Sequence, residues 1–578
     1  MRINTNNENN TTMKELLYLC NMVVMLLFMF PLTTTGVTIE VLTPGTLEQV
    51  IDDSDEPSFK DLKITGQINA VDISYLRTGT GRIATVENLD LSEVTIVSGG
   101  GSYATVSYSD NSNTMDNYVI TFYVAEENRK ETTFESNMLG GNNFHITYYS
   151  NQLAGAFANK SYKTVVMPKN VKEIGPMTFF QCKDLINVEF ANPIEVIDER
   201  AFESCVNMKD IDLSKLKTLG QGAFAGCESL RGSADETLDL SSLDIIPDNA
   251  FGETAFKHIV FSTQLKQIGA QAFYYCESLE EIVLPEGLEE IGIYAFYGCS
   301  SLTTVNIPSS VQNFDYDMFG NTPWLSTLPA VDGVVYLNNI AVRYMNDDRA
   351  DFSITIREGT ESIAPNFMSN DSKEYLTSVV LPQTIKRIGG GAFNGCSNLS
   401  SINFPEGLES IEDESPHQWG GDVYTTNEGA FGGTGLTSVI LPSTLKSIGQ
   451  HTFYYCSSLE SITLPEGLEE IGSGAFAYCT KLTSVTFPES IKKIGCGAFS
   501  GCTSLAGSVT IPKDVTELGS GIFDETNLFS IIYLAENAFL DGESGESGIF
   551  SAERVTIGAD VQSLPDGFFS YCKTLKKV

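Results

Sequence analysis

Apolar and small residues return at fixed intervals from about residue 151 to the end of the chain. The repeating unit reads A-F-x-x-C-x-x-L-x-x-I-x-L-P-x-x-L-x-x-I-G, and Cys456, Cys479 and Cys502 mark its period of 23 residues. One unit is too short to bury its own apolar side chains, so each unit must stack on its neighbours. The pattern therefore predicts a solenoid of stacked coils over residues 151–578.

Each coil is expected to contain one short parallel strand. Over Ile462–Leu464 two apolar residues alternate with a polar one, which is the period of a strand with one buried face. Pro465 follows and ends the strand, because proline has no N–H to donate to the ladder. Gly472 precedes Phe476 by four residues, which suggests a turn with positive φ. A helical turn should then direct the phenylalanine ring into the core.

Residues 37–150 lack the repeat. The stretches that begin at Leu62, Val71 and Val86 have the patterns of a strand, an amphipathic helix and a second strand. Because the first coil would otherwise expose an apolar end to water, this region is expected to cap the solenoid. The segment 103–149 is polar and rich in Tyr and Asn, and the sequence assigns it no role.

Residues 1–36 have the pattern of a secretory signal peptide. An apolar run over Leu16–Leu32 is followed by small and polar residues up to Gly36, so cleavage would free Val37. The polar segment before Met13 suggests that translation starts at Met13. The alternative is an uncleaved anchor, since about 17 residues is the lower limit for a spanning helix. We favour cleavage, which predicts a secreted or cell-surface protein whose mature chain does not insert into a membrane.

Two insertions interrupt the repeat, near residues 321–366 and 412–429. In the first, Asn338 and Asn339 stand between two β-rich runs, which predicts a projecting hairpin with a type I′ turn. The second contains Trp419. A tryptophan on a loop can anchor a partner, and the alternative is that it packs its own loop onto the coil.

The charge of the chain limits its partners. It has 35 Lys and Arg against 74 Asp and Glu, a formal net charge of −39 at pH 7. Such a protein repels a phosphate backbone, so nucleic acid is excluded as a partner. Hydrophobic residues make up 42% and charged residues 19%, so the chain has the composition of a folded protein.

Ten of the twelve cysteines occupy one column of the repeat. They are Cys182, Cys205, Cys227, Cys276, Cys299, Cys396, Cys456, Cys479, Cys502 and Cys572. Other coils have Asn or Thr in this column, so Cys227 faces Thr254 where a disulfide partner should stand. Neighbouring coils are close enough for disulfides, but this occupancy favours buried free thiols over disulfides or a metal site.

The recurrence of A-F-x-x-C together with L-P resembles the BspA-like leucine-rich repeats of surface proteins, over roughly residues 151–578. The resemblance implies an α/β leucine-rich-repeat solenoid with short parallel strands, preceded by the small α/β N-terminal capping region. It also implies display outside the cell, where several relatives act as adhesins toward host matrix proteins or other cells.

Signals for catalysis are nearly absent. The four histidines are isolated, and neither an H-E-x-x-H nor a G-x-S-x-G motif occurs. The glycine-rich turns at Ile388 and Ile494 belong to the repeat and lack the following Lys-Ser/Thr of a phosphate loop. Asp541–Gly548 could hold a weakly bound Ca²⁺ ion, but we favour a flexible acidic loop without a bound ion. We therefore predict a non-enzymatic protein without cofactor or metal; the alternative is an enzyme whose site lies in residues 37–150.

The outward side chains of the strands remain as the candidate functional surface. We predict that an extracellular protein binds this ribbon, with Trp419 as a further contact. The candidate residues on the strands are Asn306, Asn403, Thr463, Thr486 and Thr510. The alternative partner is a glycan, bound by exposed rings such as Tyr274, Tyr275, Tyr297, Tyr454, Tyr455 and Trp419. The null hypothesis for each residue is a β-forming side chain on a solvated sheet.

Overall fold

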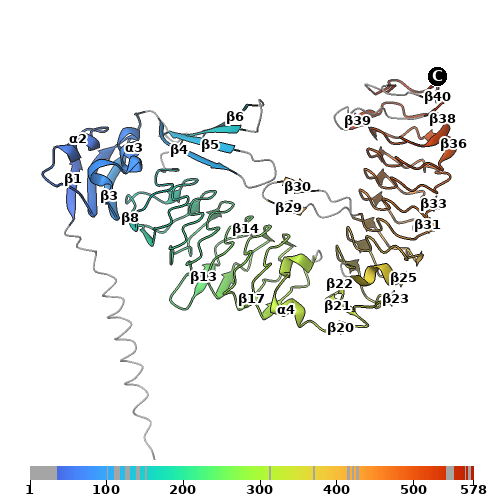
Figure 1. The fold of residues 1–578 in the computed structure, drawn as a ribbon, viewed down its shortest axis with the longest axis horizontal. Helices are drawn as coiled ribbons and strands as arrows, with labels where there is room; N and C mark the ends of the chain where they lie inside the picture. The colour runs from blue at the N-terminus through green and yellow to red at the C-terminus, as the bar shows by residue number, and fades with distance from the viewer. Residues whose placement is uncertain are drawn as a thin grey trace, which may run out of the picture.

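The computed structural model describes the chain from Gly36 onward with short gaps (Figure 1). The described ranges are 36–100, 102–109, 117–123, 131–137, 143–149, 153–311, 314, 316–368, 371–412, 417–419, 422–424, 429–541, 552–565, 568–569 and 574–578. The predicted signal peptide, the segment 542–548 of the acidic loop and Cys572 lie outside these residues, as does the side chain of Trp419.

The N-terminal unit continues directly into the solenoid. Its elements are β1 (Val37–Val41), α2 (Leu47–Asp52), β2 (Asp61–Ile68), α3 (Ala70–Thr78), the 3₁₀ turn η1 (Gly81–Ile83) and β3 (Asn88–Ile96). The predicted strand, helix and strand are thus confirmed. The sheet order β1-β2-β3-β8-β10 is parallel throughout and joins this unit to the first two coil strands, β8 (Thr164–Val166) and β10 (Asn187–Glu189). The first coil therefore has a partner strand on its N-terminal side.

A carboxylate fixes the position of α3. The Asp72 side chain is buried and accepts the backbone N–H groups of Gly45, Leu47 and Asn69 at 2.6, 2.8 and 3.0 Å. Asn69 caps the helix through its own side chain, which accepts the N–H of Val71 at 2.9 Å. These bonds satisfy donors at the helix start and join the helix to the loop after β1.

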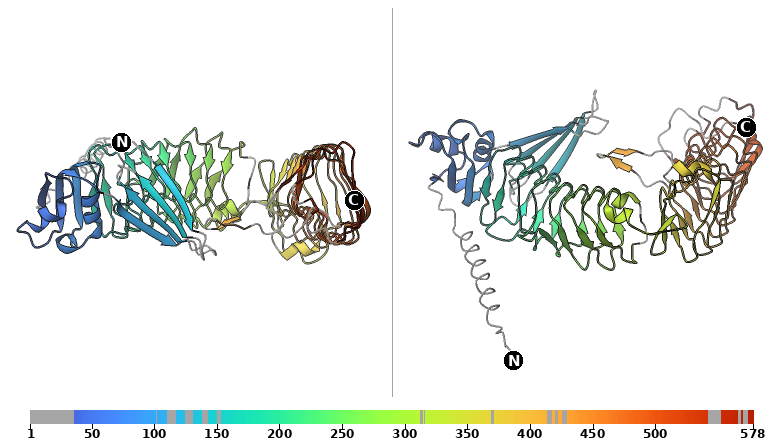
Figure 2. Two further views of the ribbon diagram at one scale, coloured as in Figure 1. Left: turned by 90° about the horizontal axis from the view of Figure 1, so that it is seen from above. Right: turned by 60° about the horizontal axis from the view of Figure 1, so that its bottom comes forward.

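A separate sheet is inserted between β3 and β8, which pair directly with each other. It consists of β4 (Ser102–Ser109), β5 (Asn117–Tyr123), β6 (Glu131–Asn137) and β7 (Asn143–Tyr149) in the order β4-β5-β7-β6. The pairs β4/β5 and β6/β7 are antiparallel, and β5/β7 is parallel. Figure 2 shows this sheet extending from the N-terminal unit beside the first coils.

Most coils contribute strands to two faces, where the sequence predicted one strand per coil. The first face carries the predicted I-x-L strands, with Ile282 buried between exposed Glu281 and Val283. After β8 and β10 its strands are β13 (Thr237–Leu240), β15 (His258–Phe261), β17 (Glu281–Val283), β19 (Thr304–Asn306), β23 (Phe352–Thr355), β25 (Leu376–Val380), β27 (Ser401–Ile402), β31 (Ser438–Ile440), β33 (Ser461–Thr463), β36 (Ala506–Ile511), β38 (Asn527–Tyr533) and β40 (Arg554–Ile557).

The second face is made mostly of two-residue strands that directly precede the position of the repeat glycine. Its strands are β9 (Glu173–Ile174), β11 (Val196–Ile197), β12 (Thr218–Leu219), β14 (Ile245–Ile246), β16 (Gln267–Ile268), β18 (Glu290–Ile291), β24 (Ser362–Ile363), β26 (Arg387–Ile388), β28 (Ser410–Ile411), β32 (Ser447–Ile448), β34 (Glu470–Ile471), β35 (Lys493–Ile494), β37 (Glu517–Gly519) and β39 (Phe539–Asp541). The strands from β24 onward belong to one continuous sheet.

The role predicted for the repeat glycine is wrong. Gly472 and Gly495 do not have positive φ; the left-handed residues are Gly474 (φ +61°) and Gly497 (φ +58°), two positions later. A Cβ on Gly495 would lie 2.4 Å from the backbone nitrogen of Ser473 in the preceding coil. The glycine is therefore required because two backbones approach closely there. The segment that follows forms turns around Phe476 and not the predicted helical turn.

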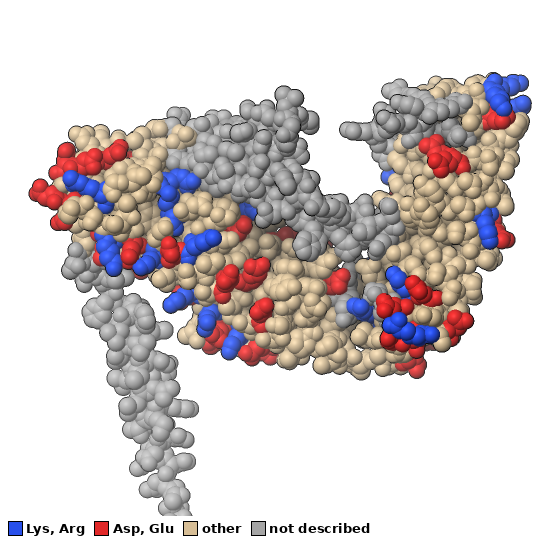
Figure 3. Space-filling model, in the orientation of Figure 1, with Lys and Arg blue, Asp and Glu red and all other residues tan. Residues whose placement is uncertain are grey.

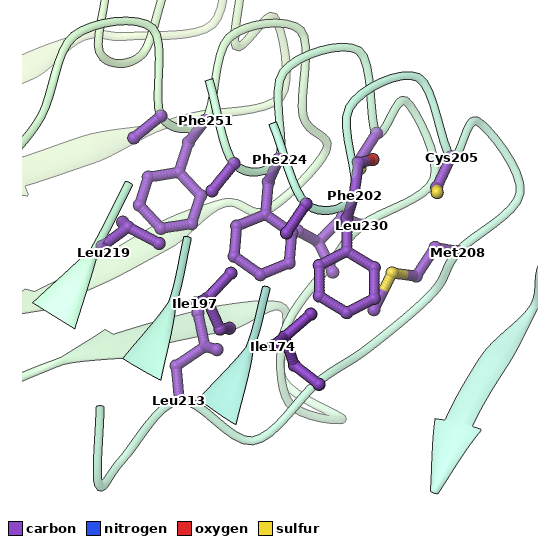
Figure 4. Close-up of a cluster of buried hydrophobic side chains, with 14 of the residues drawn as sticks. Ile174, Ile197, Phe202, Cys205, Met208, Leu213, Leu219, Phe224, Leu230 and Phe251 are labelled. Atoms are coloured by element: carbon purple, nitrogen blue, oxygen red, sulfur yellow. The ribbon is translucent and has the colours of Figure 1, made fainter. Parts of the chain in front are cut away.

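Stacked phenylalanines form the centre of the solenoid. Phe202 and Phe224 stack with ring centroids 5.2 Å apart, and Phe224 and Phe251 with centroids 5.4 Å apart, with interplanar angles of 2° and 4°. Figure 4 shows these rings in a row, with Ile174 and Ile197 from the second face packed beside them. Each repeat thus buries its own ring against the rings of its neighbours.

The first insertion forms the predicted hairpin, but the hairpin does not project, and its turn is not type I′ because only Asn338 of the two turn residues has positive φ. Its strands β21 (Val334–Leu337) and β22 (Ile340–Tyr344) pair antiparallel, and β22 then pairs parallel with β24 in the long sheet. Alternate side chains belong to different core clusters: Val335 and Ile340 pack in the N-terminal core, Val334 and Ala341 in the C-terminal core. A strand buried on both faces therefore joins two cores.

The remaining elements of the chain are short. Before the hairpin lie the 3₁₀ turn η2 (Tyr316–Phe319), α4 (Pro323–Ser326) and β20 (Ala330–Val331), which pairs with β21. The 3₁₀ turn η3 (Asp371–Tyr375) precedes β25. The second insertion contains the strand pair β29 (His417–Trp419) and β30 (Asp422–Tyr424). The solenoid bends near β20–β22, so that its two halves run in different directions (Figures 1 and 2).

Candidate functional site

The strand face exposes a ribbon of mixed apolar and polar side chains. At the outward position, Val283, Val380 and Ile440 are 67, 51 and 73% exposed. The predicted Thr463 and Thr510 are exposed on β33 and β36, and Thr486 is exposed on the coil between them, which forms no strand. Figure 1 places β31, β33 and β36 along one edge of the C-terminal half.

The structure brings only some of the predicted residues together. Thr463 pairs with Ile440 across β31/β33, and Thr510 pairs with Ile532 across β36/β38. Asn306 pairs with Val283 in the N-terminal half, on a different sheet from those that contain Thr463 and Thr510. The candidates therefore form no single cluster.

Asn306 and Asn403 each bind the backbone of the preceding coil. The Asn403 carboxamide accepts the N–H of Leu381 at 2.7 Å and donates to its carbonyl at 2.9 Å. Asn306 makes the same two bonds with Leu284, at 2.7 and 3.2 Å. Both residues thus have a structural role that the sequence did not reveal; their predicted binding role stays a prediction.

This role leads to a stability prediction. Asn403→Ala is expected to lower the free energy of unfolding by about 1–3 kcal/mol, because the N–H and C=O of Leu381 both lose their partner. Thr463→Ala, an exposed substitution at the equivalent position of another coil, should change it by less than about 0.5 kcal/mol. Urea unfolding of both variants measures the difference, and equal effects would contradict the structural role.

The cysteine column is confirmed as a set of free thiols. All ten cysteines within the described residues are free, nine of them in the column and buried, with Cys496 outside it. Most column thiols donate to the carbonyl of the phenylalanine in the preceding coil, as Cys276 does to Phe251 at 3.1 Å and Cys456 to Phe431 at 3.0 Å. Burial raises the pKa of Cys276 and Cys456 to about 11, so these thiols are neutral and unreactive at pH 7.

The tyrosines of the glycan hypothesis form two clusters. In the N-terminal half Tyr274 lies against Tyr275 and stacks on Tyr297, with centroids 4.6 and 5.7 Å apart. In the C-terminal half Tyr455 stacks on Tyr478 with centroids 4.7 Å apart. The sequence indicated these rings, but it did not show that neighbouring coils bring them together.

A pocket of about 590 Å³ opens beside the N-terminal tyrosine cluster. Its lining includes Tyr274 and Tyr275, together with Thr254 and the carboxylates Glu228, Glu253 and Glu277. Sequence reasoning missed these glutamates because they occupy variable positions. The missing residue after Thr254, seen when coil lengths are compared, was the signal that could have identified the site.

Salt bridges between coils use many of the basic residues. Lys492 lies 2.6 Å from Glu469, one coil away, and Lys217 lies 2.7 Å from Glu195. Figure 3 shows such lysines and arginines beside acidic side chains on the visible face. Pairs as exposed as these contribute little to stability, because water and salt screen them. Acidic residues outnumber basic ones by two to one in the sequence, so the basic residues are too few to pair one to one with the carboxylates.

The described residues contain no metal-type group of three or more His, Cys, Asp or Glu side chains. Within the same part of the chain, no helix has the length and apolar character needed to cross a bilayer.

Two faces of short parallel strands around a stacked phenylalanine core define a leucine-rich-repeat solenoid. The chain belongs to the BspA-type leucine-rich repeat family: the model of that repeat region matches residues 153–234, 236–347, 351–415 and 425–544, more than half of the sequence. The family resemblance seen in the sequence is thereby confirmed.

Several solved structures are similar to the chain. A leucine rich cell surface protein from Faecalibacterium prausnitzii shares 25% identity over 70% of this chain and 94% of its own, with a TM-score of 0.30. The leucine rich repeat protein of T. pallidum shares 24% identity over 43% of this chain and 91% of its own, with a TM-score of 0.24. The pneumococcal vaccine antigen PcpA shares 16% identity over 84% and 93%, with a TM-score of 0.26. No curated protein matches the sequence.

Proposed function

We propose that this protein is a non-enzymatic binding protein, secreted or displayed on the cell surface, that adheres to host or cell-surface proteins through the first strand face. The observation that carries the proposal is that the first strand face exposes apolar side chains, above all Val283, Val380 and Ile440, at the outward positions of strands whose other side is buried. Apolar side chains exposed on a protein surface can mark a protein-binding site. Membership of the repeat family, and the match to a protein described as a cell surface protein, support the location.

The proposal predicts that charge on the strand face abolishes binding. Ile440→Lys combined with Thr463→Lys places two lysines on paired strands, and affinity for a partner should fall at least about tenfold because two long charged side chains occupy the contact surface. The wild-type partner is first identified on an array of extracellular matrix and cell-surface proteins. Binding of the variant is then measured by surface plasmon resonance.

The matched control lies on the second face. Ser410→Lys combined with Ser447→Lys adds the same charge, again on paired strands, and should leave binding unchanged. If both double variants bind normally while deletion of residues 412–429 abolishes binding, the recognition surface is the Trp419 insertion and the strand-face proposal is wrong.

Glycan binding is the second candidate. It is favoured by Tyr455, which is 52% exposed while its ring stacks on Tyr478. A sugar ring packs on such an aromatic face through its C–H groups. A glycan array tests this candidate: a hit that Tyr455→Ala removes and the strand-face variant retains would support it over protein adhesion.

A further inference from the structure

The pocket beside Tyr274 lies where one coil has one residue fewer after its column position than the coil that follows it. Thr254 follows Phe251 by three residues, as Cys276 follows its own phenylalanine. The buried strand residue Ile259 then comes five positions after Thr254, whereas Ile282 comes six after Cys276. The shortened coil therefore lacks the turn that its neighbours form after their cysteines.

This shortening leaves a notch between two full-length turns. We use "notch" for the pocket lined by Glu228, Glu253, Thr254, Tyr274, Tyr275 and Glu277. Glu228 belongs to the turn of the preceding coil and Glu277 to that of the following coil. Thr254 lies between them, buried, and its hydroxyl donates to the Phe251 carbonyl at 2.7 Å. Thr254, which forms the floor of the notch, is therefore held in place, and the walls of the notch carry carboxylates.

The charge of the notch is uncompensated. Glu228, Glu253 and Glu277 are all exposed, and no basic side chain of the described residues forms a salt bridge with any of them. The nearest lysine in sequence, Lys257, is occupied by Glu236 at 3.1 Å and by Glu280 at 3.5 Å. A cationic group would thus meet a concave site whose negative charges have no internal partner.

The tyrosine wall adds a second attraction for a cation. A Cβ at Gly298 would meet Cγ, Cδ1 and Cδ2 of Tyr275 at 3.0 Å, so that ring lies against Gly298 of the next coil. It remains 39% exposed. An aromatic face held in place beside carboxylates attracts ammonium and guanidinium groups through its quadrupole.

The backbone at Tyr275 is compatible with glycine. Its φ is +52°, in the left-handed region, where the equivalent positions of two other coils have Gly226 (φ +70°) and Gly298 (φ +76°). Positive φ is a general feature of this position of the repeat, because Ser204 and Glu253 also have it. A glycine at Tyr275 would therefore remove the ring and keep the backbone conformation.

We propose that the notch binds a lysine or arginine side chain of a protein partner. This site is separate from the strand face, so it does not depend on the adhesion proposal. No metal-type grouping occurs among the described residues, which fits an extended organic cation better than a metal ion. A neutral sugar would leave all three carboxylates uncompensated.

The chain contains a natural counterpart of the notch. In the C-terminal half the shortened coil of Thr434 precedes Tyr454 and Tyr455, and the Thr434 hydroxyl lies 3.3 Å from the Cys456 thiol, as that of Thr254 lies 3.2 Å from Cys276. The positions of the three glutamates are occupied there by Ser397, Gly433 and Ser457. The two sites share the tyrosine pair and differ in charge.

The test measures binding of a fluorescent peptide of alternating Lys and Gly residues to the full-length protein by anisotropy. Glu228→Gln, Glu253→Gln and Glu277→Gln together should weaken binding at least about fivefold. The control replaces Glu286, Glu466 and Glu489 by Gln, which changes the net charge equally at exposed turns outside the notch. This control should alter affinity less than about twofold.

Two further variants separate recognition from unfolding. Tyr275→Gly introduces the residue that neighbouring coils use at this φ, so the protein should fold, and peptide affinity should fall about threefold. Tyr455→Gly at the uncharged counterpart should leave peptide binding unchanged. Equal loss in the notch and control glutamate variants would overturn the proposal, because net charge alone would then explain binding. The proposal would also be overturned if the wild-type protein bound a neutral glycan, Tyr275→Gly abolished that binding and the notch glutamate variant retained it.

Discussion

Gly495→Ala is expected to lower the free energy of unfolding by about 3 kcal/mol or more, one of the two largest effects in this molecule. The added Cβ would lie 2.4 Å from the Ser473 nitrogen, and the atoms that it meets are backbone atoms of the adjacent coil. Neither backbone can move without separating paired strands, because β34 and β35 are hydrogen-bonded immediately before this point. Overpacking against fixed atoms carries costs of this size.

Urea unfolding of the full-length protein, followed by circular dichroism, measures the effect. Gly359→Ala is the control: its φ is +85° and no atom lies within 4 Å of the added Cβ, so backbone strain alone should cost about 1 kcal/mol. If both variants lose the same stability, close approach between coils is not what requires glycine at Gly495.

Gly495 shows what sequence reasoning could and could not predict. The spacing of Phe476, Cys479 and the I-x-L strands predicts the solenoid, because the apolar period of the chain is the period of its coils. The contact of Gly495 with Ser473 joins residues a full coil apart, and no local pattern encodes it. The sequence marked the right residue and gave the wrong physical reason.

Other features were missed because they are too short or depend on neighbours. A two-residue strand such as Glu290–Ile291 shows no alternation, so the second face had no recognisable signal. The hairpin residues Val334 and Val335 read as an ordinary exposed insertion, since only the stacked coils on both sides reveal two buried faces. The outward position of Asn403 was predicted correctly, but its bonds to Leu381 depend on coil spacing.

The candidate site was predictable in part. Exposure of Thr463, Thr486 and Thr510 follows from alternation along the strands, and the tyrosine pairs are visible in the sequence. The notch required a comparison of coil lengths. One missing residue after Thr254 changes which side chains become neighbours, and this change converts three unremarkable surface glutamates into the walls of a pocket.

Alkaline pH is expected to unfold the protein cooperatively through the cysteine column. Burial raises the pKa of Cys227, Cys396 and Cys502 to about 12 and that of Cys276 and Cys456 to about 11, from an ordinary value of 9.0. Below pH 9 the thiols are protonated in both states, and their contribution is fully present. Above pH 9 the unfolded chain releases these protons first, so stability falls until pH reaches the folded pKa.

The size of this effect follows from the number of thiols. Each thiol costs about 1.4 kcal/mol per pH unit between its unfolded and folded pKa, and the losses of separate coils add. Two or three thiols therefore remove several kcal/mol by pH 11, which is comparable to the whole stability of an ordinary domain. Circular dichroism measured as a function of pH should show an unfolding transition between pH 9 and 12. The buried thiols should react with a thiol reagent only as this transition proceeds.

Serine substitutions separate the thiols from the lysines and tyrosines that titrate in the same range. Cys227→Ser combined with Cys276→Ser retains a hydroxyl that can donate to the same carbonyls and removes two titrating groups. This variant should be less stable than wild type at pH 7, since burying a hydroxyl costs more than burying a thiol, and more stable than wild type at pH 11. The two stability curves should therefore cross above pH 9. Parallel curves would show that ionisation of the buried column does not drive alkaline unfolding.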